Sequence, residues 1–181
     1  MLFRSSAADV KTLYAAVDDF VDLGGEAVTL SGNTSVADAN VVSAATSGVV
    51  TATISEGAMA TLAGLSSDGQ VNAYTITVTD TTGVSAAALN TLNGKTSEKV
   101  VVTAVNSISG SAADVKTLYA SAAADFTGLG NEAVTLIGST SVSDANEVSG
   151  ATSGVVTATK IGRAHVLNSS HSSVSRMPSS A

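Results

Sequence analysis

Cysteine and tryptophan are absent from this 181-residue chain, and proline occurs once, at Pro178. Without cysteine no disulfide framework can form, although this absence does not assign the protein to a reducing compartment. Aromatic residues make up only 3% of the sequence, so Ala and Val supply most of the apolar content. A core of such small side chains is thin, and it suits stacked repeats better than one thick globule.

Basic residues are also scarce. Residues 6–159 contain no Arg or His, and their only basic residues are Lys11, Lys95, Lys99 and Lys116. All 15 acidic residues of the chain lie in the same segment, so its net charge is −11. Phosphate neutralisation needs clustered Lys and Arg, so we expect neither a nucleic-acid partner nor binding to an anionic membrane surface. No run approaches the ~20 apolar residues of a transmembrane helix, so we expect no membrane insertion.

Both ends of the chain resemble translated sequencing adapter. The segment "IGRAHV" is what the adapter string ATC GGA AGA GCA CAC GTC encodes, and "MLFRS" matches adapter read in the opposite orientation. We therefore expect residues 1–5 and 160–181 to be adapter-derived and 160–181 to be disordered. A genuine Ser-rich, basic, solvated tail is the alternative.

The rest of the chain repeats itself. The segment "SAADVKTLYA" occurs at 6–15 and again, letter for letter, at 111–120. Residues 26–53 match 132–159 at 23 of 28 positions. Self-similarity at a fixed period marks repeat architectures. We expect a first long repeat over 6–110 and a partial second repeat over 111–159.

Within the long period, short strands alternate with short helices. The runs "EAVTL", "GVVTATI", "VNAYTITVTD" and "EKVVVTAV" are β-branched and bounded by turn residues, as strands are. Helical spacing follows in the intervening stretches at Val10, Leu13 and Tyr14, at Met59, Leu62 and Leu65, and at Leu89 and Leu92. Four strands per period predict coils of about 26 residues. We predict an α/β fold, a strand–helix repeat solenoid with parallel strand stacking. Tandem immunoglobulin-like β-sandwich domains are the alternative, because one such domain has about 100 residues.

Four S-x-x-D motifs mark helix starts, at residues 6–9, 35–38, 111–114 and 141–144. The serine oxygen can accept from an unpaired N–H of the first turn, and the carboxylate favours the positive end of the helix dipole. The same spacing could also belong to a set of acidic metal ligands. Helix capping is the preferred interpretation, because it explains all four copies.

Few residues remain that could serve in catalysis or in binding a metal or nucleotide. His165 and His171 fall in the adapter-like end, which removes the essential member of a Ser-His-Asp triad or a histidine zinc site. "LGGEAV" and "LGNEAV" lack the spacing of a nucleotide-binding loop, and their glycines are expected to turn the chain into the next strand. We therefore predict no catalytic, cofactor-binding or metal-binding residues and no enzyme activity.

Calcium is a possible partner, because carboxylates gather before one of these turns. Asp18, Asp19 and Asp22 precede "LGGE", whereas the second copy keeps only Asp125 of the three, and Glu26 and Glu132 follow. Oxygen ligands suit calcium, but no known calcium loop is present, so a solvated acidic loop is the preferred interpretation.

Threonines recur at the strand period of two, so each set is expected to line one face of a sheet. The sets are Thr51 and Thr53; Thr75, Thr77 and Thr79; and Thr157 and Thr159. Such a surface could contact ice or a crystalline polysaccharide, or it could simply be the solvent side of the sheet, where Thr is favoured.

The segments "YTITVTDTTGVSAAALNTLNG", "SISGSAADVKTLYA" and "GLGNEAVTL" resemble the Ala/Thr/Asp-rich units of very long repetitive proteins that bacteria secrete or display. The resemblance implies a structural or adhesive segment of an extracellular, adhesin-like protein. Its partners would be cell-surface or extracellular matrix components such as polysaccharide. A calcium- or carbohydrate-binding repeat module is the alternative function.

Overall fold

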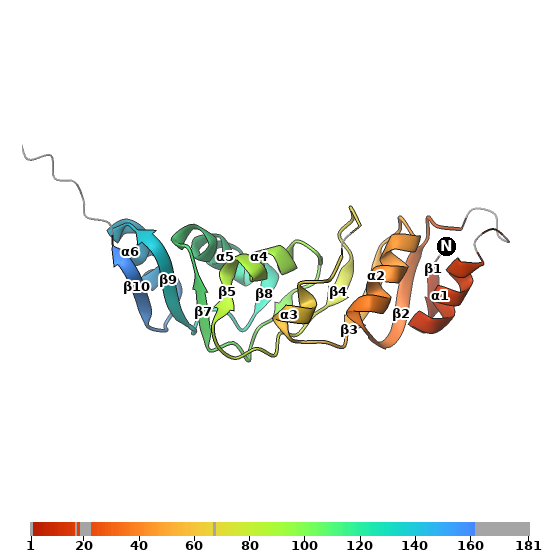
Figure 1. Cartoon of the computed structure of the whole chain (residues 1–181), viewed down its shortest axis with the longest axis horizontal. Helices are drawn as coiled ribbons and strands as arrows, with labels where there is room; N and C mark the ends of the chain where they lie inside the picture. Colours follow the sequence, from red (N-terminus) through yellow and green to blue (C-terminus); the bar gives the residue numbers. More distant parts are fainter. Residues whose placement is uncertain (1, 17, 19–22, 67, 162–181) are drawn as a thin grey trace, which may run out of the picture.

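A computed structural model describes residues 2–16, 18, 23–66 and 68–161. Strands and helices alternate along the chain. The strands are β1 (Leu2–Ser5), β2 (Ala27–Thr34), β3 (Val50–Ile54), β4 (Ala73–Thr75), β5 (Val84–Ser85), β6 (Val100–Val101), β7 (Ser107–Gly110), β8 (Phe126–Thr127), β9 (Ala133–Thr140) and β10 (Val156–Ile161). The helices are α1 (Ala7–Ala15), α2 (Val36–Ala45), α3 (Met59–Leu62), α4 (Ala86–Asn93), α5 (Ala112–Asp125) and α6 (Val142–Ala151). Figure 1 shows them along one long axis, from α1 at one end to β10 at the other.

All strand pairs among the described residues are parallel, and they form three sheets with the orders β1-β2-β3-β4, β10-β9-β7-β5 and β6-β8. Paired residues lie 20 to 26 positions apart, as in Asn33↔Thr53 and Val100↔Phe126. The two strands of each pair are therefore linked by a segment of the chain that contains a helix. The α/β class with parallel strands is confirmed, and the immunoglobulin-like alternative is wrong, because a sandwich of that kind is built from antiparallel strands.

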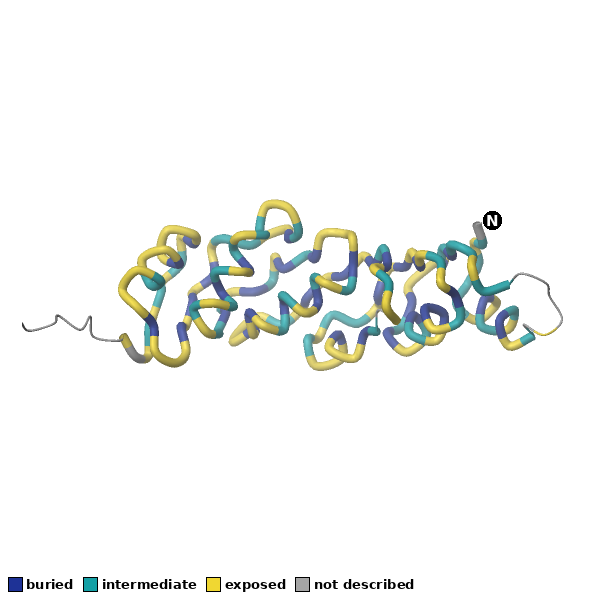
Figure 2. Tube along the Cα trace, turned by 90° about the horizontal axis from the view of Figure 1, so that it is seen from above, coloured by how far each residue is buried: buried dark blue, intermediate teal, exposed yellow. Residues whose placement is uncertain are grey.

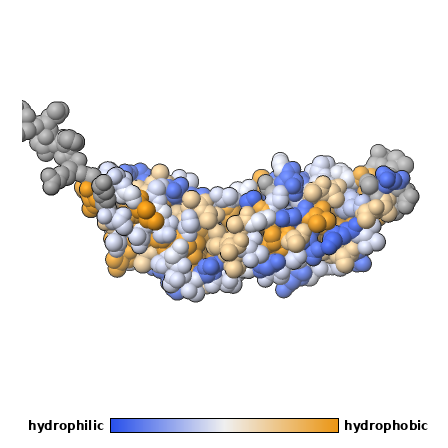
Figure 3. All heavy atoms as spheres, in the orientation of Figure 1, coloured by the Kyte–Doolittle hydropathy of each residue, from blue (hydrophilic) through white to orange (hydrophobic). Residues whose placement is uncertain are grey.

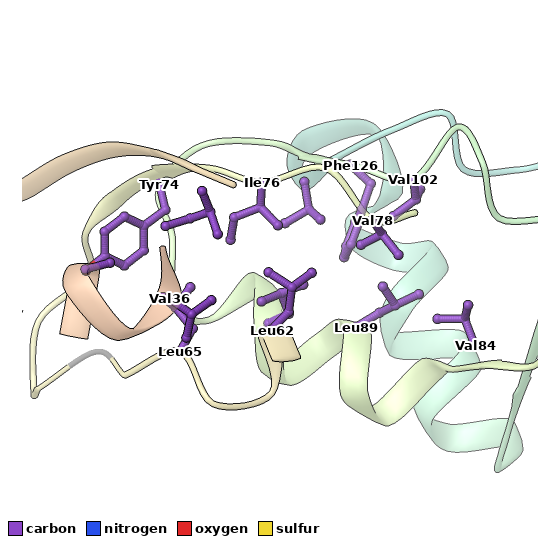
Figure 4. Packing of buried hydrophobic residues seen from close by; sticks show 14 of the residues in the cluster. Val36, Leu62, Leu65, Tyr74, Ile76, Val78, Val84, Leu89, Val102 and Phe126 are labelled. Carbon is purple, nitrogen blue, oxygen red and sulfur yellow. The ribbon is translucent and has the colours of Figure 1, made fainter. Parts of the chain in front are cut away.

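One face of the sheets is covered and the other faces solvent. Residues of β3 alternate between buried and exposed, and α2 and α4 turn apolar side chains inward. Tyr74, Ile76 and Val78 from the strand side lie opposite Leu62 and Leu89 from the helices (Figure 4). The buried residues form one hydrophobic cluster that runs along the whole length of the molecule (Figure 2). This is the thin core that the composition predicts.

The predicted helix starts are confirmed. In all four S-x-x-D motifs the serine oxygen accepts a hydrogen bond from the main-chain N–H of the aspartate, over 3.0 to 3.2 Å. The helices themselves differ from the expected spans: α3 ends at Leu62, and Leu65 is buried in the turn that follows. α5 runs to Asp125 although α1, with the same first nine residues, ends at Ala15.

β3, β4 and β6 are shorter than the runs that predicted them, whereas β2 extends past its run to Thr34. Four strands were not predicted. "VNAYTITVTD" contains β4 and an isolated bridge from Thr77 to Val101, and "EKVVVTAV" contains only β6. The unpredicted strands are β1, β5, β7 and β8, and they have two to four residues each. Segments this short cannot display a period of two, so only their neighbours in space make them strands.

The two chain ends are partly built into the sheets. Residues 2–5 form β1, and Lys160 and Ile161 continue β10, so the expectation of disorder is wrong for these last two residues. The remainder, 162–181, lies outside the described residues. Four helices, α1 to α4, lie within 6–110, and two, α5 and α6, within 111–159.

Candidate functional site

The solvent-facing side of the sheets carries rows of hydroxyl groups. All seven threonines that the period of two assigned to one face are exposed, as predicted. In the first sheet Thr29 pairs with Thr51, and Thr53 pairs with Thr75. Neighbouring residues of a row lie about 4.8 Å apart, the spacing between strands of a sheet.

The longest row crosses the second sheet. Ser85 pairs with Ser109, Ser109 with Thr135, and Thr135 with Thr157, so one hydroxyl comes from each of four successive strands. Ser85, Thr135 and Thr157 are exposed and Ser109 is half-buried. We call these four residues the hydroxyl row. The Ser85 hydroxyl accepts from the Ala88 N–H over 3.4 Å as a helix cap, and the Ser109 hydroxyl donates to the Gly83 main-chain oxygen over 3.5 Å. Thr135 and Thr157 are therefore the members of the row that are best placed to contact a ligand.

A second set of threonines points inward and bonds to main-chain oxygens 20 to 22 residues earlier in the chain. The hydroxyls of Thr46, Thr96 and Thr152 donate to the main-chain oxygens of Glu26, Tyr74 and Glu132, over 2.7 to 2.9 Å. The serine that follows each threonine also donates its main-chain N–H to an earlier main-chain oxygen, that of Gly24, Asn72 or Gly130. Sequence reasoning missed this feature. The signal was the dipeptide Thr-Ser just before three of the strands, at 46–47, 96–97 and 152–153.

The glycines of "LGGE" and "LGNE" turn the chain as predicted. Gly24 and Gly130 have φ values of +114° and +124°, which side-chain-bearing residues rarely adopt. Their N–H groups donate to the carboxylates of Glu26 and Glu132 over 2.7 and 2.8 Å. The Gly24 N–H lowers the pKa of the Glu26 carboxyl below its ordinary value.

Glu132 is fully buried, and Tyr119 donates its hydroxyl to the Glu132 Oε2 atom over 3.1 Å. Burial raises the pKa of the Tyr119 hydroxyl, which therefore stays protonated. The Glu132 Oε1 atom has no partner among the described residues. The Glu132 side chain thus points into the interior, and its hydrogen bonds stabilise the turn at Gly130.

The acidic residues considered for calcium do not come together in the described part of the chain. Asp18 is exposed, and Asp125 accepts a hydrogen bond from the Asn93 amide over 3.0 Å. Asp19 and Asp22 lie outside the described residues. Among the residues that the structure describes, no group of three or more His, Cys, Asp or Glu side chains could hold a metal ion.

Ion pairs join neighbouring helices at the capping aspartates. Lys11 of α1 contacts Asp38 of α2 over 2.6 Å, and Lys116 of α5 contacts Asp144 of α6 over 2.8 Å. The hydrogen bond from Lys116, followed by that from Ser141, holds the pKa of the Asp144 carboxyl below 3.8. The same contact raises the pKa of the Lys116 ammonium, so this lysine remains protonated at neutral pH and cannot act as a base.

In the described part of the chain, the grooves include two small ones between helices. One, of about 180 Å³, lies between α5 and α6 and is lined by Lys116, Tyr119 and Glu147 beside Ala120, Val148 and Ala151. The other, of about 220 Å³, lies between α3 and α4 and is lined mainly by Met59, Leu62 and Leu92. Both are below the 300 Å³ or so at which ligand pockets usually begin. His165 and His171 lie outside the described residues.

No protein-family model, no curated protein and no solved structure matches this chain. None of the described helices has the length and apolar character needed to cross a membrane.

Proposed function

We propose that this chain is a segment of a large repetitive extracellular bacterial protein and has a structural or adhesive role. Its architecture in this proposal is a strand–helix solenoid, in which each coil of 20 to 26 residues is held by the coils before and after it. The observation that carries the proposal is the spacing of the parallel strand pairs, which never exceeds 26 residues. An extended structure of this kind suits a structural or adhesive role, because it gives length and a large exposed surface.

Internal contacts support this role. The inward threonines Thr46, Thr96 and Thr152 each bond to the preceding turn, and the Lys11–Asp38 and Lys116–Asp144 pairs join successive helices. Side-chain contacts thus reinforce the main-chain pairing along the long axis. The acidic surface favours a hydrated, non-aggregating segment because net charge keeps protein molecules apart.

Small-angle X-ray scattering of the purified chain tests the extended architecture. A solenoid gives a rod-like pair-distance distribution with one cross-section and a long tail. A compact chain of 181 residues has a radius of gyration of about 16 Å, so a value near this figure would contradict the proposal. The proposed adhesive role predicts that cells displaying the chain attach to polysaccharide-coated surfaces better than cells displaying a scrambled sequence.

A carbohydrate-binding module is the second candidate, and the hydroxyl row favours it because its groups share one register across four strands. Cosedimentation with insoluble cellulose or chitin measures the binding directly. The double variant Thr135→Lys, Thr157→Lys should abolish it. Thr12→Lys, Thr117→Lys is the matched control, since it adds the same charge to exposed helix positions. Equal loss in both variants would count against the row.

Calcium binding is tested separately by melting the chain with calcium and then with a chelator. A site that binds only the folded chain raises the melting temperature as calcium is added. An unchanged melting temperature would remove calcium from the proposal and leave the structural role in place.

A further inference from the structure

Two dipeptides of this chain carry the groups for a spontaneous change of the main chain. Asn93–Gly94 is its one Asn-Gly pair, and Asp68–Gly69 is its one Asp-Gly pair. In each, the glycine nitrogen can attack the side-chain carbonyl carbon of the residue before it, because glycine has no Cβ atom to hinder the approach. The sequence alone makes Asn93 the more reactive of the two, since at neutral pH a carboxylate is a poorer electrophile than a carboxamide.

The structure protects the Asn93 pair. Asn93 is the last residue of α4, and Gly94 caps the helix with a φ of −65°, so the pair keeps helical geometry. The Gly94 N–H donates to the Asn90 main-chain oxygen over 3.2 Å. The Asn93 carboxamide donates to the Asp125 carboxylate, at the end of α5, over 3.0 Å. Both reacting groups are thus engaged, and attack requires the end of α4 to open first.

The Asp68 pair lies open. It occupies the turn between α3 and β4, which projects from the body of the molecule in Figure 1, and Figure 3 shows hydrophilic surface there. Asp68 and Gly69 are both exposed. A Cβ atom at Gly69 would meet nothing within 4 Å. The Gly69 N–H has no hydrogen-bond acceptor among the described residues, so its nitrogen is available to react.

The main chain of this turn has an uncommon conformation. Asp68 has a φ of +43°, and it is the one residue other than glycine with a positive φ in the described part of the chain. Residues with a side chain seldom adopt this left-handed conformation. The Ser66 hydroxyl donates to the Asp68 Oδ1 atom over 2.9 Å and accepts from the Asp68 N–H over 3.3 Å. These surface contacts break more easily than a helix end, because no packed element has to move.

We propose that Asp68–Gly69 is a site of spontaneous isoaspartate formation in the folded protein, whereas Asn93–Gly94 is protected. The Gly69 nitrogen forms a bond to the Asp68 Cγ atom, and the hydroxyl of the protonated carboxyl leaves with the amide proton as water. The product is a succinimide ring, which a water molecule then opens. Breaking the new bond restores aspartate, whereas breaking the original bond to the main-chain carbonyl carbon gives isoaspartate, in which the main chain runs through Cγ.

Isoaspartate adds one atom to the main chain of the turn. Two contacts with the α2 side flank the reacting pair: the Ser66 N–H donates to the Asn40 Oδ1 atom over 2.8 Å, and the Gln70 amide donates to the Thr46 main-chain oxygen over 2.9 Å. The extra atom changes the span between these contacts, and the carboxylate that the Ser66 hydroxyl contacts moves to a new position. Modification should therefore loosen the turn where it lies against α2.

Storage of the purified full chain at neutral pH and physiological temperature for several weeks tests the proposal. Peptide mapping with electron-transfer fragmentation distinguishes isoaspartate from aspartate, and deamidation shows as a gain in mass. We expect isoaspartate at residue 68 while Asn93 stays intact. In guanidinium chloride the order should reverse, because both pairs are then open and the carboxamide reacts faster. Deamidation of Asn93 in the folded chain as fast as the change at Asp68, or an unmodified Asp68, would overturn the proposal.

Asp68→Asn provides the matched comparison, because the folded chain then holds the same dipeptide in both places. Asn tolerates the left-handed conformation as Asp does, and circular dichroism checks that the fold is kept. Residue 68 should lose its amide at least about tenfold faster than Asn93, which reacts only when the helix end opens. In guanidinium chloride the two rates should converge. Similar rates in the folded variant would overturn the proposal, and if the variant does not fold, the two sites of the parent chain still decide.

Discussion

The Thr96 hydroxyl donates to the Tyr74 main-chain oxygen over 2.7 Å and accepts from the Tyr74 N–H over 2.9 Å. One buried side chain thus satisfies both main-chain groups of a residue in the preceding turn. It also accepts from the Glu98 N–H over 3.0 Å. Because three main-chain groups depend on it, this threonine joins two segments whose strand pairing consists of the isolated bridges Asn72↔Thr96 and Thr77↔Val101.

Thr96→Val should lower the free energy of unfolding by about 1–3 kcal/mol, because buried main-chain groups would lose their partner while the volume stays the same. Urea denaturation followed by circular dichroism measures the change. Thr53→Val is the control, since Thr53 is exposed and a β-branched apolar residue is tolerated there. Its effect should stay within about 0.5 kcal/mol. Equal effects would show that the interior bond contributes nothing.

Gly154→Ala and Gly150→Ala should have opposite signs. A Cβ atom at Gly154 would overlap the main-chain carbonyl of Glu132, so the backbone of two turns would have to separate. A Cβ atom at Gly150, within α6, meets nothing within 4 Å. We expect Gly154→Ala to cost more than 2 kcal/mol or so, in the range of overpacked cores, and Gly150→Ala to stabilise by about 0.5–1 kcal/mol. Thermal denaturation of the pair gives the comparison.

Ser141→Ala should cost about 1 kcal/mol of stability, the typical value of a helix N-cap. The Ser141 oxygen accepts from the Asp144 N–H, and the same hydroxyl donates to the Asp144 carboxylate over 2.6 Å. Ser143→Ala is the matched control, because Ser143 lies exposed within the first turn of α6 and alanine is the better helix former there. A loss in both variants would mean that the cap is not the cause.

The pKa of Asp144 should rise toward 3.8 in Lys116→Met, because the hydrogen bond from Lys116, the larger of the causes that lower it, is gone while that from Ser141 remains. A carboxyl with a lowered pKa in the folded state stabilises the fold above its ordinary value, and this stabilisation is lost as the pH falls through the lower, folded value. The variant should therefore melt below the parent at about pH 6, and the difference should shrink below about pH 3.8. Carbon-13 NMR titration of the carboxyl signals gives the pKa.

Lys99→Met controls this titration. The Lys99 ammonium donates to the Ala123 main-chain oxygen and not to a carboxylate, so its removal takes away one charge without touching Asp144. An equal shift of the Asp144 pKa in both variants would point to a general charge effect.

Much of the local structure could be predicted from the sequence. The S-x-x-D motifs gave the helix starts because an N-cap needs only residues within three positions of one another. The exposed threonines followed from the period of two, and the turns at Gly24 and Gly130 followed from glycine itself. The parallel arrangement followed from strands alternating with helices. All these features depend on neighbours along the chain.

Contacts between segments that are distant in the sequence could not be predicted in the same way. The inward threonines share their residue type with the outward ones, and only the packing of segments 20 to 22 residues apart decides which hydroxyl meets a main-chain oxygen. The two-residue strands β5, β6 and β8 exist because a neighbour in space supplies the other half of the ladder.

Val36 and Val142 show most directly what could not be predicted from the sequence. Their sequence surroundings are nearly the same, so local rules assign them the same state, yet one is buried and the other exposed. The sequence by itself determined the capped helices, the turns and the faces of the strands, since these arise from forces that act over a few residues. Only the tertiary structure decided which copy of a surface is covered, because burial depends on whether another segment lies against it.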